Sequence, residues 1–307
     1  MRARFFLMEN PAAGVAGTPL VEDVVRELKR QGAAVTRARG DDIAAARRMA
    51  REAADSGAFD AIVAAGGDGT VRHMGAALIG SQADLGIIPV GTGNVLAHEI
   101  GLAPKAAVVA RMLRHGPAVK VACAEANGEP FLLMAGIGFD ARVVAGLSQR
   151  LKSLVGKAAY AGPLIDAIVR PADALTVTVD GQHHAASWAV IANARHYGGS
   201  FVLAPRTGIL QRGLQAILFK TTSRAALLGQ LMGILATGRL EPAARRGREV
   251  EMLACSRVTV TSHRPVPVQI DGDSFGATPL EVDAGRDELR LIVPEPAGAS
   301  GGSGSAR

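Results

Sequence analysis

Residues 60–70 read DAIVAAGGDGT, and residues 85–94 read LGIIPVGTGN. In each stretch a short apolar run ends in glycines, as expected for a buried strand followed by a tight loop. A third apolar run, at residues 4–8, is followed by NPAAG at residues 10–14. Glycine lets the backbone turn sharply and approach a ligand closely. We therefore expect the three loops to lie together at one edge of a parallel sheet.

The first hundred residues alternate between strand and helix patterns. Strands are predicted at residues 4–8, 33–38, 61–65 and 85–90, and helices at residues 19–30, 41–54, 71–79 and 95–100. Apolar strands joined to helices by short loops favour a doubly wound α/β fold, in which helices cover both faces of a parallel sheet. Such sheets bind ligands at the carboxyl ends of their strands, where the glycine loops occur.

The pattern changes after about residue 120. Runs such as ALTVTVDG, SWAVIANA and SRVTVTS are rich in strand-forming residues and are separated by Gly, Asn and Asp turns. We predict an α/β domain at residues 1–120 and a β-rich domain at residues 121–293, interrupted by helices near residues 141–154 and 224–237. Whether the last strand returns to the first domain is left open. The small, polar tail at residues 294–307 is predicted to be disordered.

Composition and charge narrow the range of partners. The chain has 307 residues, a formal charge of +6 and a sequence pI of about 9.8, which favours nucleotides, phosphates or an anionic membrane surface. Aromatic residues make up 4%, and no zinc-finger or RNA-recognition motif occurs, so nucleic acid is not an expected partner. Cys123 and Cys255 lie in apolar runs and are expected to be free thiols, as in a cytoplasmic protein. The apolar runs are too short to span a bilayer.

The glycine loops favour phosphate binding without fitting the common nucleotide motifs. A loop that enters a helix presents unpaired N–H groups to an anion. No GK[ST] follows either loop, which excludes a Walker A motif, and neither loop fits the dinucleotide fingerprint well. GIGFDA, at residues 136–141, matches G-x-G-x-x-A, but it lies in the β-rich half of the chain.

NPAAG, GGDGT, PVGTGN, GIGFDA and VQIDGD, in this order, resemble the diacylglycerol kinase catalytic-domain family. This family includes bacterial lipid kinases and sphingosine kinases, and the resemblance extends to about residue 293. It implies a nucleotide domain related to those of NAD kinases and phosphofructokinases, followed by a β-sandwich domain that receives the lipid. The cofactors it implies are ATP and Mg²⁺.

The resemblance also implies which residues bind the nucleotide. They are Asn10, Thr36, Gly66, Gly67, Asp68, Gly69, Thr70, Val71, Arg72, Gly91, Thr92 and Asn94. Thr36 is expected at the end of its strand, facing the nucleotide. Because a carboxylate beside phosphates is repulsive without a cation, Asp68 is expected to hold Mg²⁺ through water. The alternative is an aspartate that caps the next helix.

Asp273 occupies the position of the family's catalytic glutamate, in the sequence Asp271-Gly272-Asp273. The resemblance implies that Asp273 is the base that accepts the proton of the lipid hydroxyl. The alternative is a hairpin turn, since Asp-Gly is a common two-residue loop. Arg72 and His73 stand where the family often has Asn-Glu. Arg72 is interpreted either as a cation for the phosphates or as an exposed surface arginine.

The leading hypothesis is an ATP- and Mg²⁺-dependent lipid kinase that converts diacylglycerol to phosphatidic acid. The alternatives are a kinase of a sphingoid base or another lipid alcohol, a NAD kinase-like or soluble-alcohol kinase, and a catalytically weak protein that binds nucleotide or lipid. The helix at residues 223–237 has an apolar stripe that fits either core packing or transient binding to an anionic membrane. The stripe comprises Leu227, Leu228, Leu231, Met232 and Leu235, and the flanking basic residues are Arg224, Arg239, Arg245, Arg246 and Arg248. A homodimer is compatible with the sequence.

Overall fold

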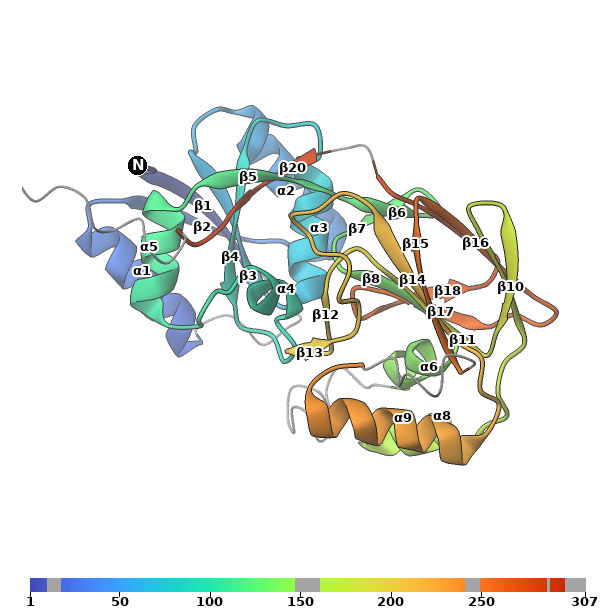
Figure 1. The fold of residues 1–307 in the computed structure, drawn as a ribbon. Coiled ribbons are helices and arrows are strands. Elements are labelled where there is room, and N and C mark those ends of the chain that lie inside the picture. The colour runs from blue at the N-terminus through green and yellow to red at the C-terminus, as the bar shows by residue number, and fades with distance from the viewer. Residues whose placement is uncertain (10–17, 147–160, 241–248, 286–287, 296–307) are drawn as a thin grey trace, which may run out of the picture.

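The computed structural model describes residues 1–9, 18–146, 161–240, 249–285 and 288–295 (Figure 1). Asn10 and the rest of the NPAAG loop lie outside the described residues, as do Arg245, Arg246 and Arg248. Most of the predicted tail, from residue 296 onward, also lies outside them. The described part forms two lobes, one built on a parallel sheet and the other on antiparallel strands.

The sheet of the first lobe has the strand order β2-β1-β3-β4-β20-β5. In that order the strands are Ala34–Arg39, Arg4–Glu9, Ala61–Gly66, Asp84–Pro89, Glu288–Ile292 and Ala118–Ala122. The first four strands run parallel, and β20, from the end of the chain, adds to β4 in the same direction. Strand β5 closes the far edge antiparallel to β20. The end of the sequence therefore completes the sheet that the first strands began.

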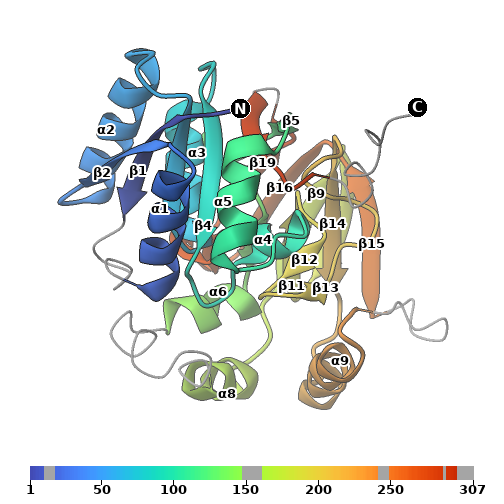
Figure 2. The ribbon, with the colours of Figure 1, turned by 90° about the vertical axis from the view of Figure 1, so that its left-hand side faces the viewer.

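Helices cover both faces of this sheet, as the sequence predicts for a doubly wound fold. Helices α1 (Pro19–Arg30) and α5 (Ala106–His115) pack together on one face, and α2 (Ile43–Asp55) and α3 (Asp68–Leu78) pack together on the other (Figure 2). Helix α3 begins three residues before its predicted start, directly after Gly67. Helix α5 was not predicted, although its buried residues follow helical spacing.

The second lobe is a β-sandwich of two antiparallel six-stranded sheets. One sheet, in the order β10-β9-β16-β19-β6-β7, comprises Gln182–Ala186, Leu175–Val179, Arg257–Ser262, Leu280–Asp283, Ala124–Ala126 and Glu129–Phe131. The other, in the order β15-β14-β11-β8-β17-β18, comprises Val250–Cys255, Leu214–Phe219, Trp188–Ala192, Met134–Ile137, Pro267–Ile270 and Asp273–Ala277. Alternate side chains of both sheets form one apolar core between them. The predicted fold class is confirmed.

Several short helices and strands lie outside the six-stranded sheets. A two-stranded ribbon, β12 (His196–Tyr197) with β13 (Phe201–Val202), lies near helix α4 (Val95–Glu99). Helix α6 (Phe139–Ala145) packs on the sandwich, and α8 (Ala161–Val169) and α9 (Arg224–Thr237) lie together at its lower edge (Figure 1). No helix within the described ranges has the length and hydropathy needed to cross a membrane.

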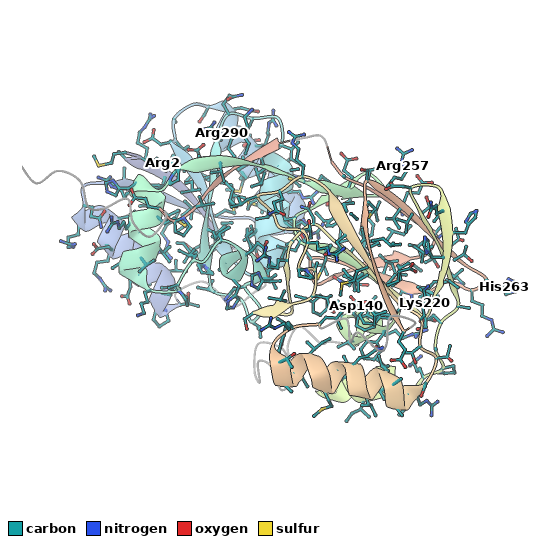
Figure 3. The ribbon with its side chains drawn as sticks, viewed as in Figure 1. Arg2, Asp140, Lys220, Arg257, His263 and Arg290 are labelled. Carbon is teal, nitrogen blue, oxygen red and sulfur yellow. The ribbon has the colours of Figure 1, made fainter. Side chains whose placement is uncertain are left out.

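A buried carboxylate ties both ends of the described chain to β4. Asp84 forms ion pairs of 2.7 Å with Arg2, near the amino terminus, and with Arg290, on β20. Figure 3 shows these two arginines on the first lobe. Because Asp84 is only 8% exposed, the pairing is partly shielded from water and fixes β20 beside β4.

The substitution Leu291→Ala tests whether β20 is part of the core. Leu291 is fully buried on this strand, so truncating it should lower the free energy of unfolding by about 2–5 kcal/mol. Leu210, which is 58% exposed, is the matched control, and Leu210→Ala should stay within about 0.5 kcal/mol of the parent. Urea unfolding followed by circular dichroism measures both. Equal stabilities of the two variants would contradict the placement of β20.

Candidate active site

The two glycine loops touch each other at the carboxyl ends of β3 and β4. A Cβ atom added to Gly91 would lie 2.4 Å from the Cα of Gly67, closer than any side chain tolerates. The N–H of Val90 also donates a hydrogen bond of 3.2 Å to the carbonyl of Gly66. The glycines thus allow two backbone segments to pack without side chains between them.

Asp68, the first residue of α3, links this pair of loops to α4. Its carboxylate accepts hydrogen bonds from the N–H groups of Val95 (3.0 Å) and Leu96 (3.1 Å), which lie in the first turn of α4. The capping alternative is therefore observed, but the capped helix is α4 and not the helix that contains Asp68. A carboxylate oxygen that accepts one hydrogen bond keeps a second lone pair. Magnesium binding by Asp68 stays a prediction.

Asn94 closes the second loop on itself. Its backbone has a φ of 47°, its Oδ1 accepts from the N–H of Gly91 (2.8 Å), and its Nδ2 donates to the carbonyl of Gly91 (2.8 Å). Asparagine tolerates this left-handed conformation better than most residues. The side chain of Asn94 is thus committed to the loop, and Thr92 lies within that loop, half-buried.

Other residues that were predicted to bind the nucleotide lie in less suitable positions for binding it. Thr36 is exposed in the middle of edge strand β2, and the prediction that it ends the strand is wrong because the strand continues to Arg39. Thr70 and Val71 are buried in the first turns of α3, so the side chain of Val71 faces the core. Only the backbone of Val71 could approach a ligand.

The hairpin between β17 and β18 carries the second acidic motif. Asp271 and Gly272 have φ values of 48° and 84°, so the hairpin-turn alternative is observed. The carboxylate of Asp271 is buried and accepts hydrogen bonds from three consecutive N–H groups, those of Leu132 (2.8 Å), Leu133 (2.9 Å) and Met134 (2.9 Å). Burial raises the pKa of Asp271 to about 6, against the lowering effect of these bonds. The turn is thereby fixed to the segment that leads into β8.

Asp273, just after this turn, lies against the first glycine loop. A Cβ atom added to Gly69 would lie 2.6 Å from Oδ2 of Asp273. The side chain of Asp273 is 36% exposed, so its carboxylate is both held by the protein and open to solvent. Gly69 follows Asp68 in the chain, so Asp273 of the second lobe lies beside the residue next to the other predicted acid.

Arg72 is buried, and its interpretation as an exposed surface arginine is wrong. It is 5% exposed and pairs with Asp273 and with Glu129 of β7, each at 3.1 Å. His73 lies between the guanidinium groups of Arg72 (3.1 Å) and Arg47 (2.8 Å). Burial, reinforced by these two positive charges, lowers the pKa of His73 to about 4, so its ring is neutral at pH 7.

Asp140, at the start of α6, was not identified as a site residue. Its buried carboxylate accepts hydrogen bonds from Trp188 Nε1 (3.1 Å), the Tyr197 hydroxyl (3.2 Å) and Gln269 Nε2 (3.1 Å). Gln269 in turn accepts from the N–H of Gly272 (2.8 Å), so the network reaches the turn before Asp273. Burial raises the pKa of Asp140 to about 6. Figure 3 labels Asp140, which lies in the second lobe. An acid directly after the apolar run GIGF was the available signal.

Each of the two lobes matches a known family of protein domains. Residues 4–126 match the diacylglycerol kinase catalytic domain, and residues 134–293 match the YegS C-terminal NAD kinase beta sandwich-like domain. The chain belongs to this family of lipid kinases. It is a kinase, and its β-sandwich is the kind found in the carboxyl-terminal half of these proteins.

Individual relatives agree with this assignment. The chain is 33% identical over 259 residues to "Probable lipid kinase YegS-like" of Pseudomonas aeruginosa, covering 81% of each protein. It is 28% identical over 305 residues to a diacylglycerol kinase of Mycobacterium tuberculosis, covering 94% of each. A Synechocystis protein of uncharacterized function is 31% identical over 265 residues, which span 80% of this chain but only 58% of that longer protein.

Solved structures support the fold. The crystal structure of a diacylglycerol kinase from Bacillus anthracis matches with a TM-score of 0.71 at 20% identity, covering 96% of this chain and 98% of the other. At this level of identity the likeness shows the fold, including the arrangement of both lobes.

The substitution Gly69→Ala separates a local effect at the site from an effect on stability. Gly69 has no positive φ and lies in the first turn of α3, where alanine is favoured by up to about 1 kcal/mol. The new methyl group would displace the Asp273 carboxylate, and a shift of about 1 Å can cost about a hundredfold in rate. We expect a loss of that order in lipid kinase activity with no loss in thermal stability.

Gly233→Ala, in α9, is the control for this substitution, because a Cβ atom there meets nothing within 4 Å. Its activity on detergent-dispersed lipid should equal that of the parent. Wild-type activity in Gly69→Ala would mean that the contact with Asp273 is dispensable.

Proposed function

We propose that the protein transfers the γ-phosphate of ATP to a lipid hydroxyl, with diacylglycerol as the acceptor and phosphatidic acid as the product. The observation that carries this proposal is the contact between Asp273 and Gly69, which brings an acid from the β-sandwich to the glycine loop of the parallel sheet. A phosphate held on that loop and a hydroxyl group beside Asp273 would then lie next to each other. We assign the first lobe, which includes β20 from the end of the chain, to ATP binding and the β-sandwich lobe to the lipid.

The phosphates of ATP are proposed to lie over Gly66, Gly67, Gly69 and the start of α3. The first N–H groups of a helix have no partners within the helix, and the helix dipole attracts negative charge there. Helix α3 is eleven residues long and begins at this loop. The N–H groups that begin α4 instead point at the carboxylate of Asp68, so α3 is the better anion site.

Asp68 fits a magnesium ion that is shared with ATP. Within the described ranges no group of three or more His, Cys, Asp or Glu side chains could hold a metal by itself. A site with one carboxylate suits Mg²⁺, which commonly takes one or two protein carboxylates and fills its other positions with substrate phosphates and water. Mg²⁺ bound there would neutralise charge on the transferred phosphoryl group.

Asp273 is proposed to act as the general base. Its carboxylate accepts the proton of the lipid hydroxyl as that oxygen forms a bond to the γ-phosphorus of ATP, and the bond to the β-phosphate oxygen breaks to release ADP. The anchored turn holds the acid in place, and its 36% exposure leaves room for a substrate oxygen. Positioning of this kind provides much of the catalysis in phosphoryl transfer.

An apolar surface on α8 and α9 fits a lipid substrate better than a soluble alcohol. Leu227, Leu231 and Ile234 of α9 pack toward the core, whereas the opposite side of the helix is open. The exposed apolar side chains of the two helices are Ile165, Val169, Leu228, Met232 and Leu235, which are 43–63% exposed. Arg224 and Arg239 flank α9 and are exposed. We propose that this surface, named the α8–α9 surface, rests on an anionic membrane.

A kinase assay with the variants Asp273→Asn and Asp68→Ala tests the proposed chemistry. Removal of a general base lowers rates by about 10²–10⁴-fold, and we expect a loss in this range for Asp273→Asn with little change in the KM for ATP. Asp68→Ala should raise the Mg²⁺ concentration that gives half-maximal activity. Asp283→Asn, which removes an exposed acid on β19, should change neither quantity. Labelled ATP and a total lipid extract identify the product, and equal rates for all variants would refute the proposal.

Vesicle binding tests the α8–α9 surface. Full burial of a Met or Leu side chain stabilises by about 1.5–3 kcal/mol, so Met232→Glu and Leu235→Glu should each weaken binding at least about tenfold. Val108→Glu is the control, because Val108 is 38% exposed on α5 in the other lobe. Cosedimentation with phosphatidylcholine vesicles, with and without phosphatidylglycerol, measures binding. Equal loss in the Val108 variant, or binding that ignores phosphatidylglycerol and salt, would contradict this surface.

A further inference from the structure

The interface between the two lobes contains a compact charged cluster next to Asp273. It consists of Arg47 from α2, Arg72 and His73 from α3, Glu129 from β7 and Asp273 from β18. Two guanidinium groups face two carboxylates, so the cluster is formally neutral with an uncharged imidazole between the arginines. Opposite charges placed this close favour one arrangement of the side chains over others.

Arg72 is the best fixed member of this cluster. It is 5% exposed, and its Nη1 donates to Glu129 Oε1 at 3.1 Å. The same Oε1 of Glu129 also accepts from Arg47, whose guanidinium contacts Nδ1 of His73 as well. A buried arginine destabilises the fold unless its charge is paired. Glu129 and Asp273 provide this pairing for Arg72. The guanidinium therefore has little freedom to move away from the site.

The other terminal nitrogen of that guanidinium, which also contacts Nε2 of His73, faces Asp273. Nη2 of Arg72 donates to Oδ2 of Asp273 at 3.1 Å, and the backbone of Gly69 closes on the same oxygen from another side. An aspartate has only two side-chain torsions, so a planar donor and a backbone wall are enough to select one rotamer. Without Arg72, the half-exposed carboxylate could turn toward solvent.

We infer that Arg72 is a positioning residue, whose guanidinium, anchored by Glu129, holds the carboxylate of Asp273 at the first glycine loop. This inference rests on the proposed role of Asp273 as the base. In this arrangement Arg72 contacts the carboxylate of the proposed base and acts through the rotamer of Asp273. The interpretation of Arg72 as a direct phosphate ligand is replaced by this one, because its side chain is occupied by two carboxylates.

The substitutions Arg72→Gln and Arg72→Lys provide the first test. Arg72→Gln should lower kcat about 10–100-fold while the KM values for ATP and diacylglycerol change less than about twofold, since binding surfaces are retained. Arg72→Lys keeps the charge but not the planar fork, so it should recover part of kcat. Arg114→Gln is the control for loss of a buried arginine, because Arg114 is 4% exposed on α5 and contacts none of the cluster. Wild-type kcat in Arg72→Gln would overturn the inference.

A double-mutant cycle separates action through Asp273 from an independent effect. If Arg72 acts only by orienting Asp273, then Arg72→Gln should have no further effect on kcat once Asp273 is Asn. A further tenfold loss in the double variant would overturn the inference. If Asp273→Asn alone retains wild-type kcat, the proposed function fails; if Asp273→Asn is inactive but Arg72→Gln is not impaired, only this inference fails.

A second variant covers the case in which Arg72→Gln does not fold. Glu129→Gln keeps Arg72 but weakens its anchor, so kcat should fall by a smaller factor with unchanged KM values. Circular dichroism and thermal unfolding confirm that each variant is folded before its kinetics are compared. If Glu129→Gln and Arg72→Lys both keep the wild-type kcat, the inference is overturned. This outcome does not depend on Arg72→Gln.

Discussion

The proposed active site depends on the close approach of three segments that come from distant parts of the chain. Gly67 packs on Gly91, and Gly69 packs on the carboxylate of Asp273, in each case at a distance that excludes a Cβ atom. These contacts bring the end of β3, the end of β4 and the β17–β18 turn to one place. Only glycine permits this approach. Glycines that are usually interpreted as flexible loop residues therefore act here as packing residues.

The sequence predicts the order of elements in the first lobe, but it does not predict several details of the site. Apolar strands and amphipathic helices carry local periodicity, so strands such as β3 and helix α1 were predicted within one or two residues. Asp273 and the glycine loops were also predicted from local motifs to belong to the site. The partners of these residues are set by long-range packing, which local patterns do not encode.

Arg72 and Asp140 illustrate what long-range packing adds. Arg72 looks like a surface residue in the sequence, and only the β7 strand and the β17–β18 hairpin, 57 and 201 residues away, provide the carboxylates that allow its burial. Asp140 lies in a motif that resembles a dinucleotide fingerprint, yet its partners Trp188 and Gln269 come from two other strands. In both cases a charged group is buried because distant donors or acceptors satisfy it.

Helix α6 joins the proposed membrane surface to the hairpin that carries Asp273. It contacts α8 on one side and β17 and β18 on the other, while Asp140 at its start bonds to Gln269, which bonds to the turn before Asp273. Packing contacts and hydrogen bonds thus connect α8, through α6 and Gln269, to the turn before the proposed base. A lipid whose chains lie along the α8–α9 surface would approach Asp273 past this helix. Because a functional side chain is held in place by the packing and hydrogen bonds behind it, the buried Asp140 network supports the position of the turn before Asp273.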